Sequence, residues 1–261
     1  MDIWVEDSGG DGTPLVLIHP GWGDSDIWSP MLPALRARYR VIRYDNRGYG
    51  RSPAPIEAFT QVDDLRSVLD QAGVTTAAVV AHSGGGGTAL AFALAAPERV
   101  SALVLVAPGT EDYPWPMDDP YLAEFDRRYA ANDRDGLIEL GLRTWARTDP
   151  ADPAARAQVG SAVAAFFATG DTTDDATDDT ADDTAADLAG AEPPVYDRLG
   201  EISAPAVMVR GDLEYPMVAE SADLIAGRIP GCRRVVISGA DHLLPLRAPA
   251  ELTEIIRSHV G

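Results

Sequence analysis

A serine stands at the end of an apolar run and directly before four glycines. Residues 77–81 read as a buried strand, and the alanine-rich residues 88–96 read as a helix. A sharp turn between them would hold Ser83 at the edge of a sheet, provided that its neighbours two positions away are small. Those neighbours are Ala81 and Gly85. We therefore interpret Ser83 as a nucleophile rather than as a helix cap beside a flexible glycine loop.

A serine hydroxyl is a weak nucleophile and needs a base within hydrogen-bond reach. The chain offers four histidines. His242 follows the last predicted strand, at the carboxyl edge of a parallel sheet where sites of this kind form. His82 adjoins the serine but points away from the turn, which favours a structural role. His19 ends another strand, and His259 lies in the last helix, on the surface, so His242 is the predicted base.

The base in turn needs an acid, and the developing oxyanion needs donors. The loop after the preceding strand carries two candidates for the acid, Asp212 and Glu214, and one of them must be an ordinary solvated carboxylate. The N–H of Gly84 is one expected oxyanion donor. The N–H of Trp22, between Gly21 and Gly23, is the other, although these glycines could also form a simple tight turn.

The elements around these residues alternate between strand and helix, as in an α/β protein with a mostly parallel central sheet and helices on both faces. They include a helix predicted at residues 27–39, a strand at 233–237 and a terminal helix at 249–260. The alternation stops over residues 111–198, where helices are expected at 121–131, 136–147 and 159–168. We predict that this insertion forms a helical lid on a core of residues 1–110 and 199–261. Its Trp115 and Trp145 should contact substrate together with Trp22.

Within the lid, residues 171–187 are rich in aspartate and threonine. Aspartate pairs recur every four residues, which would stack like charges on one face of a helix. A solvated loop is the preferred interpretation. Calcium binding is the alternative, but the segment lacks the turn glycine and the closing glutamate of a calcium loop.

Composition limits the partners. The formal net charge of −20 argues against nucleic acid and anionic membranes but does not identify a substrate. A small-molecule substrate is expected from the predicted nucleophile. No segment resembles a signal peptide or a membrane span, and the single cysteine, Cys232, excludes an intrachain disulfide. We expect a cytoplasmic protein whose chemistry uses no metal and no cofactor.

These motifs, taken together, resemble the α/β-hydrolase fold superfamily almost from end to end. Residues 81–85 match its nucleophile elbow, with alanine for the usual first glycine. Residues 19–23 resemble its His-Gly-x-x-Gly oxyanion loop, with Pro20 for the first glycine. Residues 45–52 resemble its Asp-x-Arg-Gly-x-Gly-x-Ser turn, and residues 239–242 its Gly-x-x-His. The resemblance implies an α/β-hydrolase fold with a serine nucleophile and an inserted lid.

The resemblance also favours Glu214 as the acid, because it holds the place where the family usually has aspartate. Asp212 stays the alternative, and Glu111 or Asp112 could serve if the acid comes from an earlier loop. The implied function is hydrolysis of an ester, lactone, thioester or related acyl bond. Two alternatives remain on the same scaffold: a non-hydrolytic cyclisation or elimination, and a non-catalytic ligand-binding protein.

Overall fold

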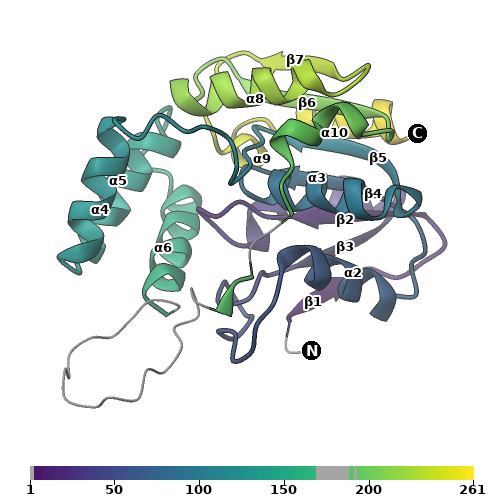
Figure 1. Cartoon of the computed structure of the whole chain (residues 1–261), viewed down its shortest axis with the longest axis horizontal. Helices are drawn as coiled ribbons and strands as arrows, with labels where there is room; N and C mark the ends of the chain where they lie inside the picture. Colours follow the sequence, from purple (N-terminus) through teal and green to yellow (C-terminus); the bar gives the residue numbers. More distant parts are fainter. Residues whose placement is uncertain (1–2, 169–187, 191–192) are drawn as a thin grey trace.

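A computed structural model describes residues 3–168, 188–190 and 193–261. Its centre is a seven-stranded sheet in the order β1-β3-β2-β4-β5-β6-β7 (Figure 1). Neighbouring strands run parallel except β1 and β3, which pair antiparallel. The mostly parallel sheet predicted from the alternation of elements is therefore confirmed. The strands are β1 Val5–Asp7, β2 Thr13–Ile18, β3 Tyr39–Tyr44, β4 Ala77–His82, β5 Val100–Val106, β6 Ala206–Gly211 and β7 Arg233–Ile237.

Both faces of the sheet are buried. In β2, Leu15 and Leu17 pack into one apolar cluster, whereas Val16 and Ile18 pack into a second cluster on the opposite face. Helices α2 and α3 cover the second cluster, and α1 and α10 cover the first. Cover on both faces explains the nearly continuous apolar runs of the strands. The core helices are α1 Leu32–Arg36, α2 Gln61–Gln71, α3 Gly85–Ala95, α8 Pro216–Arg228, α9 Leu244–Arg247 and α10 Pro249–Val260. Short 3-10 turns are Ser25–Trp28, Pro97–Arg99 and Tyr196–Glu201.

Among the described residues between β5 and β6, three α-helices stand together beside the sheet in Figure 1. They are α4 Pro120–Ala130, α5 Arg134–Trp145 and α6 Pro153–Ala168, and α5 packs against both of the others. Helix α6 begins earlier than the predicted residue 159. Its start is fixed by Asp152, whose carboxylate accepts from the Ala154 N–H at 2.9 Å, and by Pro153. The acidic residues 171–187, with the calcium alternative, lie outside the described residues.

One sequence prediction for the core was wrong. Residues 27–39 do not form a single helix but a 3-10 turn, the five-residue helix α1 and the start of β3. Pro30 and Pro33 lack an N–H and obstruct a continuous helix. Trp28 and Leu35 nevertheless pack in the same apolar cluster, so the apolar spacing that suggested one helix serves two shorter elements.

Across the described ranges, no helix has both the length and the apolarity needed to cross a lipid bilayer. Within the same ranges, no three His, Cys, Asp or Glu side chains gather in a way that could hold a metal ion. Cys232 is a partly buried free thiol.

Candidate active site

Ser83 occupies the turn between β4 and α3 with a left-handed backbone, φ 53°. A non-glycine residue in this region is strained, so its surroundings must hold it there. The Ser83 N–H donates to the Val106 carbonyl oxygen at 2.9 Å, and its own carbonyl accepts from the Gly86 N–H at 2.8 Å. A Cβ on Gly85 would lie 2.7 Å from the carbonyl oxygen of His19, so only glycine fits. The glycine run thus forms the first turn of α3, which begins before the predicted residue 88.

His242 and Glu214 form a buried pair. Nδ1 of His242 lies 2.9 Å from Oε2 of Glu214, and neither side chain is more than 1% exposed. An ionised carboxylate only accepts, so the proton between them sits on Nδ1 and leaves Nε2 as an acceptor. Among the described residues, Nε2 has no hydrogen-bond partner. In this tautomer His242 can take a proton from a nearby hydroxyl.

His82 connects this pair to the serine turn. Its Nε2–H donates to the carbonyl oxygen of His242 at 2.8 Å, and the two rings lie 4.8 Å apart. Burial lowers the pKa of His82 well below its ordinary value, and the proximity of His242 acts in the same direction. A neutral His82 therefore holds the backbone of His242 against the last residue of β4, directly before Ser83. The sequence indicated a structural role for His82 but not its partner, which lies 160 residues away.

The other carboxylates suggested by the sequence lie elsewhere. Asp212 accepts from the Ser238 hydroxyl at 2.9 Å and from the Gly239 N–H at 2.7 Å, on the surface. Asp112 accepts from the backbone N–H groups of Val195 and Tyr196, where the chain returns toward β6. Both therefore stabilise local chain geometry, and only Glu214 meets the ring of His242.

Asp241 is a supporting residue that the sequence analysis missed. It is fully buried, and its carboxylate accepts from the Thr148 backbone N–H at 2.9 Å and from the Arg247 Nε–H at 3.1 Å. Thr148 follows α5, so Asp241 ties the segment that carries His242 to the inserted helices. Its position directly before His242, the predicted base, was the feature of the sequence that could have pointed to it.

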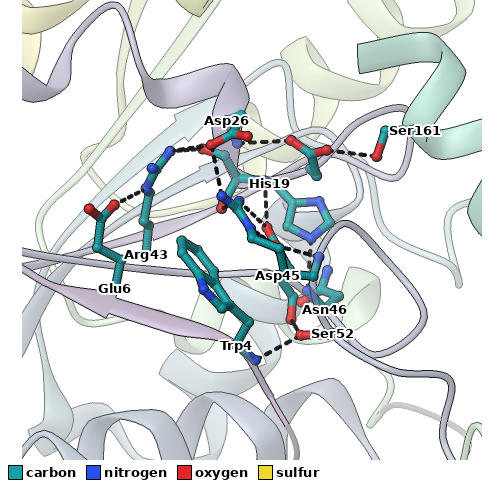
Figure 2. Close-up of polar contacts among 12 residues, drawn as sticks. Trp4, Glu6, His19, Asp26, Arg43, Asp45, Asn46, Ser52 and Ser161 are labelled. Atoms are coloured by element: carbon teal, nitrogen blue, oxygen red, sulfur yellow. Dashed lines mark hydrogen bonds and ion pairs between the residues drawn. The ribbon is translucent and has the colours of Figure 1, made fainter. Parts of the chain in front are cut away.

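The loop of residues 20–24, here called the Trp22 loop, follows His19, whose ring is held by two hydrogen bonds to the backbone. Nε2 of His19 accepts from the Asn46 N–H at 2.9 Å, so Nδ1 carries the proton and donates to the Pro20 carbonyl oxygen at 2.8 Å. Burial lowers the pKa of His19, which favours this neutral form. Figure 2 shows His19 and Asn46 beside Asp45, whose carboxylate accepts from the Ser25 N–H at 3.0 Å. The loop is thereby anchored to the core on one side.

Backbone donors approach Ser83 from two directions. Gly84 precedes α3, and the first N–H groups of a helix have no partner within it. The Trp22 loop lies opposite, since a Cβ on Gly84 would be 3.9 Å from the N atom of Gly21. Trp22, Ser83 and Gly84 all line the same cavity. This arrangement can present two N–H groups to an oxygen bound beside Ser83.

The cavity has a volume of about 440 Å³ and a mainly apolar wall. Trp115 and Trp145 line it, and the ring of Trp145 lies 4.8 Å from that of His242. Glu111 and Asp112 are the carboxylates on its wall, and none of the described residues lining it is cationic. The site therefore suits an uncharged, largely apolar molecule.

Comparisons with known proteins agree with this geometry. A sequence model of the alpha/beta hydrolase fold matches residues 13–249. A Caulobacter segnis protein named as a carbamate hydrolase, RutD, is 35% identical over 146 residues, which are 53% of this chain and 51% of that protein. The match thus spans about half the length of that relative. A pimeloyl-[acyl-carrier protein] methyl ester esterase of Aeromonas hydrophila is 28% identical over the whole of both chains.

Among solved structures, the N-acyl homoserine lactone degrading enzyme Est816 is 29% identical, with a TM-score of 0.72. The superposition covers 98% of this chain and 96% of that chain. The family model covers most of the sequence, and the observed sheet and turn agree with it. This chain belongs to the α/β-hydrolase fold family.

Proposed function

We propose that the protein is a serine hydrolase that cleaves an ester, lactone, thioester or related acyl bond of a small to medium, uncharged substrate. The observation that carries this proposal is the buried His242–Glu214 pair, whose His242 carbonyl oxygen accepts from His82, the residue before the strained turn of Ser83. The relatives named above act, by their names, on a carbamate, a methyl ester and an N-acyl homoserine lactone. Each of these presents a carbonyl carbon bonded to a leaving group.

In the proposed mechanism, Ser83 Oγ attacks the carbonyl carbon while Nε2 of His242 takes the hydroxyl proton. Glu214 keeps His242 in the required tautomer and stabilises its charged form. The N–H groups of Trp22 and Gly84 stabilise the oxyanion. Collapse of the tetrahedral intermediate breaks the bond to the leaving group, which receives the proton from His242. Water then releases the acyl group by the same steps.

The proposed substrate-binding wall consists of Trp22, Trp115 and Trp145. All three line the cavity, and their rings give a broad apolar surface. The inserted helices that carry Trp145 would act as a lid over this surface. No cofactor enters any of the proposed steps.

Covalent labelling tests the proposal directly. A fluorophosphonate probe should form one adduct per chain, on the tryptic peptide that contains Ser83, because the probe reacts with an activated serine next to oxyanion donors. Heat-denatured protein should stay unlabelled. A protein that is not labelled but still converts a substrate would instead support a non-hydrolytic enzyme, and ligand binding without turnover would support a binding protein.

Charge selection by the cavity gives a second prediction. Mono-p-nitrophenyl adipate ends in a carboxylate, whereas p-nitrophenyl hexanoate has the same chain length and is neutral. We expect kcat/KM to be at least about 30-fold higher for the hexanoate, because the cavity wall offers the carboxylate two like charges and no cation. Steady-state kinetics with both esters measures this ratio.

Glu111 should account for part of the selection. Glu111→Gln should lower the ratio of kcat/KM for the hexanoate to kcat/KM for the adipate by about three- to tenfold. The substitution removes one of the two negative charges on the cavity wall. Glu251→Gln on the exposed side of α10 is the matched control and should leave the ratio unchanged. Equal kcat/KM for the two esters in the wild-type protein would contradict the proposed substrate class.

A further inference from the structure

The ring of Trp22 is held by the inserted helices. Its centroid lies 5.0 Å from that of Phe166 on α6, 5.9 Å from Phe125 on α4 and 6.2 Å from Trp145 on α5. Each of the three helices thus places at least one aromatic ring beside Trp22, which is only 9% exposed. On α5, a Cβ at Gly141 would lie 2.7 Å from the Trp22 ring, so the helix packs directly on it.

The backbone of the Trp22 loop is bound to α6 by a reciprocal pair. The Asp24 N–H donates to Oε1 of Gln158 at 3.0 Å, and Nε2 of Gln158 donates to Oδ1 of Asp24 at 2.9 Å. Both side chains are nearly buried, at 8% and 5% exposed. A residue with both a donor and an acceptor is needed to satisfy these two groups together.

Two further features tighten this connection. The Ser161 hydroxyl, one turn further along α6, donates to Oδ2 of Asp24 at 2.6 Å. Figure 2 shows Ser161 reaching from its helix toward the polar network of the core. A Cβ on Gly23 would lie 2.4 Å from Oε1 of Gln158, so the loop and helix touch without an intervening side chain.

We infer that Gln158 is a positioning residue that sets the place of the Trp22 N–H, and hence the oxyanion geometry, from the inserted helix α6. The inference rests on the proposed function. The core fixes the Trp22 loop at His19 and Pro20, and α6 fixes it at Asp24, so the donor lies between two anchors. The inserted helices are then part of the catalytic framework as well as a cover.

The physical consequence concerns the transition state more than substrate binding. An oxyanion donor acts only when it is about 3 Å from the oxygen that gains charge, and a misplacement of about 1 Å can cost roughly 100-fold in rate. The apolar wall that binds the ground state would be largely retained without Gln158. The effect should therefore fall on kcat and leave KM nearly unchanged.

Gln158→Met tests the inference, because methionine keeps the length and helix propensity of glutamine but offers neither the amide donor nor its oxygen acceptor. We expect kcat for p-nitrophenyl butyrate to fall about 10- to 100-fold while KM changes less than about threefold. An alkyl trifluoromethyl ketone gives an independent readout. Ser83 Oγ bonds to its carbonyl carbon, the proton passes to His242, and the carbonyl electron pair becomes an alkoxide at the oxyanion position. Its affinity should fall in parallel with kcat, whereas the matching non-fluorinated ketone should bind as before.

Three further variants complete the experiment. Gln71→Met makes the same chemical change at an exposed position of α2 and should leave kcat unchanged. Leu69→Ala destabilises the opposite face of the sheet and controls for a general loss of stability. Ser161→Ala removes only the third hydrogen bond, and it should lower kcat about three- to tenfold even if Gln158→Met does not fold.

The outcomes separate the inference from the proposed function. If wild-type protein is labelled by the fluorophosphonate and Gln158→Met and Ser161→Ala keep kcat within twofold, the inference is wrong and the function stands. An equal loss of kcat in Leu69→Ala would also overturn it. If wild-type protein is not labelled, the proposed function itself fails.

Discussion

Replacing Ser83 by alanine should lower kcat for p-nitrophenyl butyrate by about 10⁴- to 10⁶-fold. Without Oγ no acyl-enzyme can form, and what remains is attack by water on a substrate held beside the oxyanion donors. The variant should still bind substrate, since the apolar wall of the cavity is intact. Stopped-flow kinetics should show a burst of p-nitrophenol with wild-type protein and no burst with this variant.

The control for this variant is Ser258→Ala on α10, whose hydroxyl donates to the Ile255 carbonyl oxygen of its own helix. It should retain wild-type kcat. Ser83→Gly should lose as much activity as Ser83→Ala but gain roughly 0.5–1 kcal/mol of stability, because glycine relieves the positive φ. Turnover above a few per cent of wild type in either Ser83 variant would refute the assignment of the nucleophile.

Such a stability gain would mean that the serine turn is retained for chemistry at the expense of stability, as strained residues at functional sites often are. The strain is contained by the close packing of Gly85 on the His19 backbone.

The local arrangement of the serine turn could be predicted from the sequence, because a strand, a serine and a run of small residues occur in direct succession. The bounds of β7 and α10 were predicted correctly for the same reason: each is a separate apolar run flanked by turn residues.

The predictions that failed depended on where a continuous pattern is interrupted. Residues 27–39 have helical apolar spacing, but two prolines divide them, and the spacing alone does not show that Trp28 and Leu35 belong to separate turns. The start of α6 was missed because an aspartate cap and a proline precede its apolar positions. Prolines and capping residues are local signals. Giving them more weight than periodicity would have predicted both the break within residues 27–39 and the start of α6.

The connections that organise the site could not be predicted in this way. Gln158 lies 134 residues from Asp24, and His82 lies 160 residues from His242. Nothing in the sequence around Gln158 distinguishes it from a solvated residue on an alanine-rich helix. Its role depends on how the inserted helices pack on the core, which is a property of the whole fold.

The residue types alone left the acid open, because Asp212 and Glu214 are two residues apart in one loop, and only the family resemblance favoured Glu214. The backbone turns between them, so that Asp212 faces Ser238 and Gly239 while Glu214 faces the ring of His242. The longer side chain of glutamate reaches Nδ1 at 2.9 Å and still accepts from the Tyr215 N–H. Substituting each carboxylate in turn should therefore give two very different values of kcat.

Glu214→Gln should lower kcat about 10³- to 10⁴-fold, whereas Asp212→Asn should keep it within about twofold. A glutamine amide can donate to Nδ1 of His242, which moves the ring proton to Nε2 and leaves no acceptor for the serine hydroxyl. The amide also fails to stabilise the charged imidazole that forms in the transition state. Both changes replace a carboxylate by its amide, so each variant controls for the other. Kinetics with p-nitrophenyl butyrate, together with urea unfolding of both variants, measures the difference. A large loss in Asp212→Asn with little loss in Glu214→Gln would reverse the assignment, because the hydrogen bond to Nδ1 would then have no part in activating Ser83.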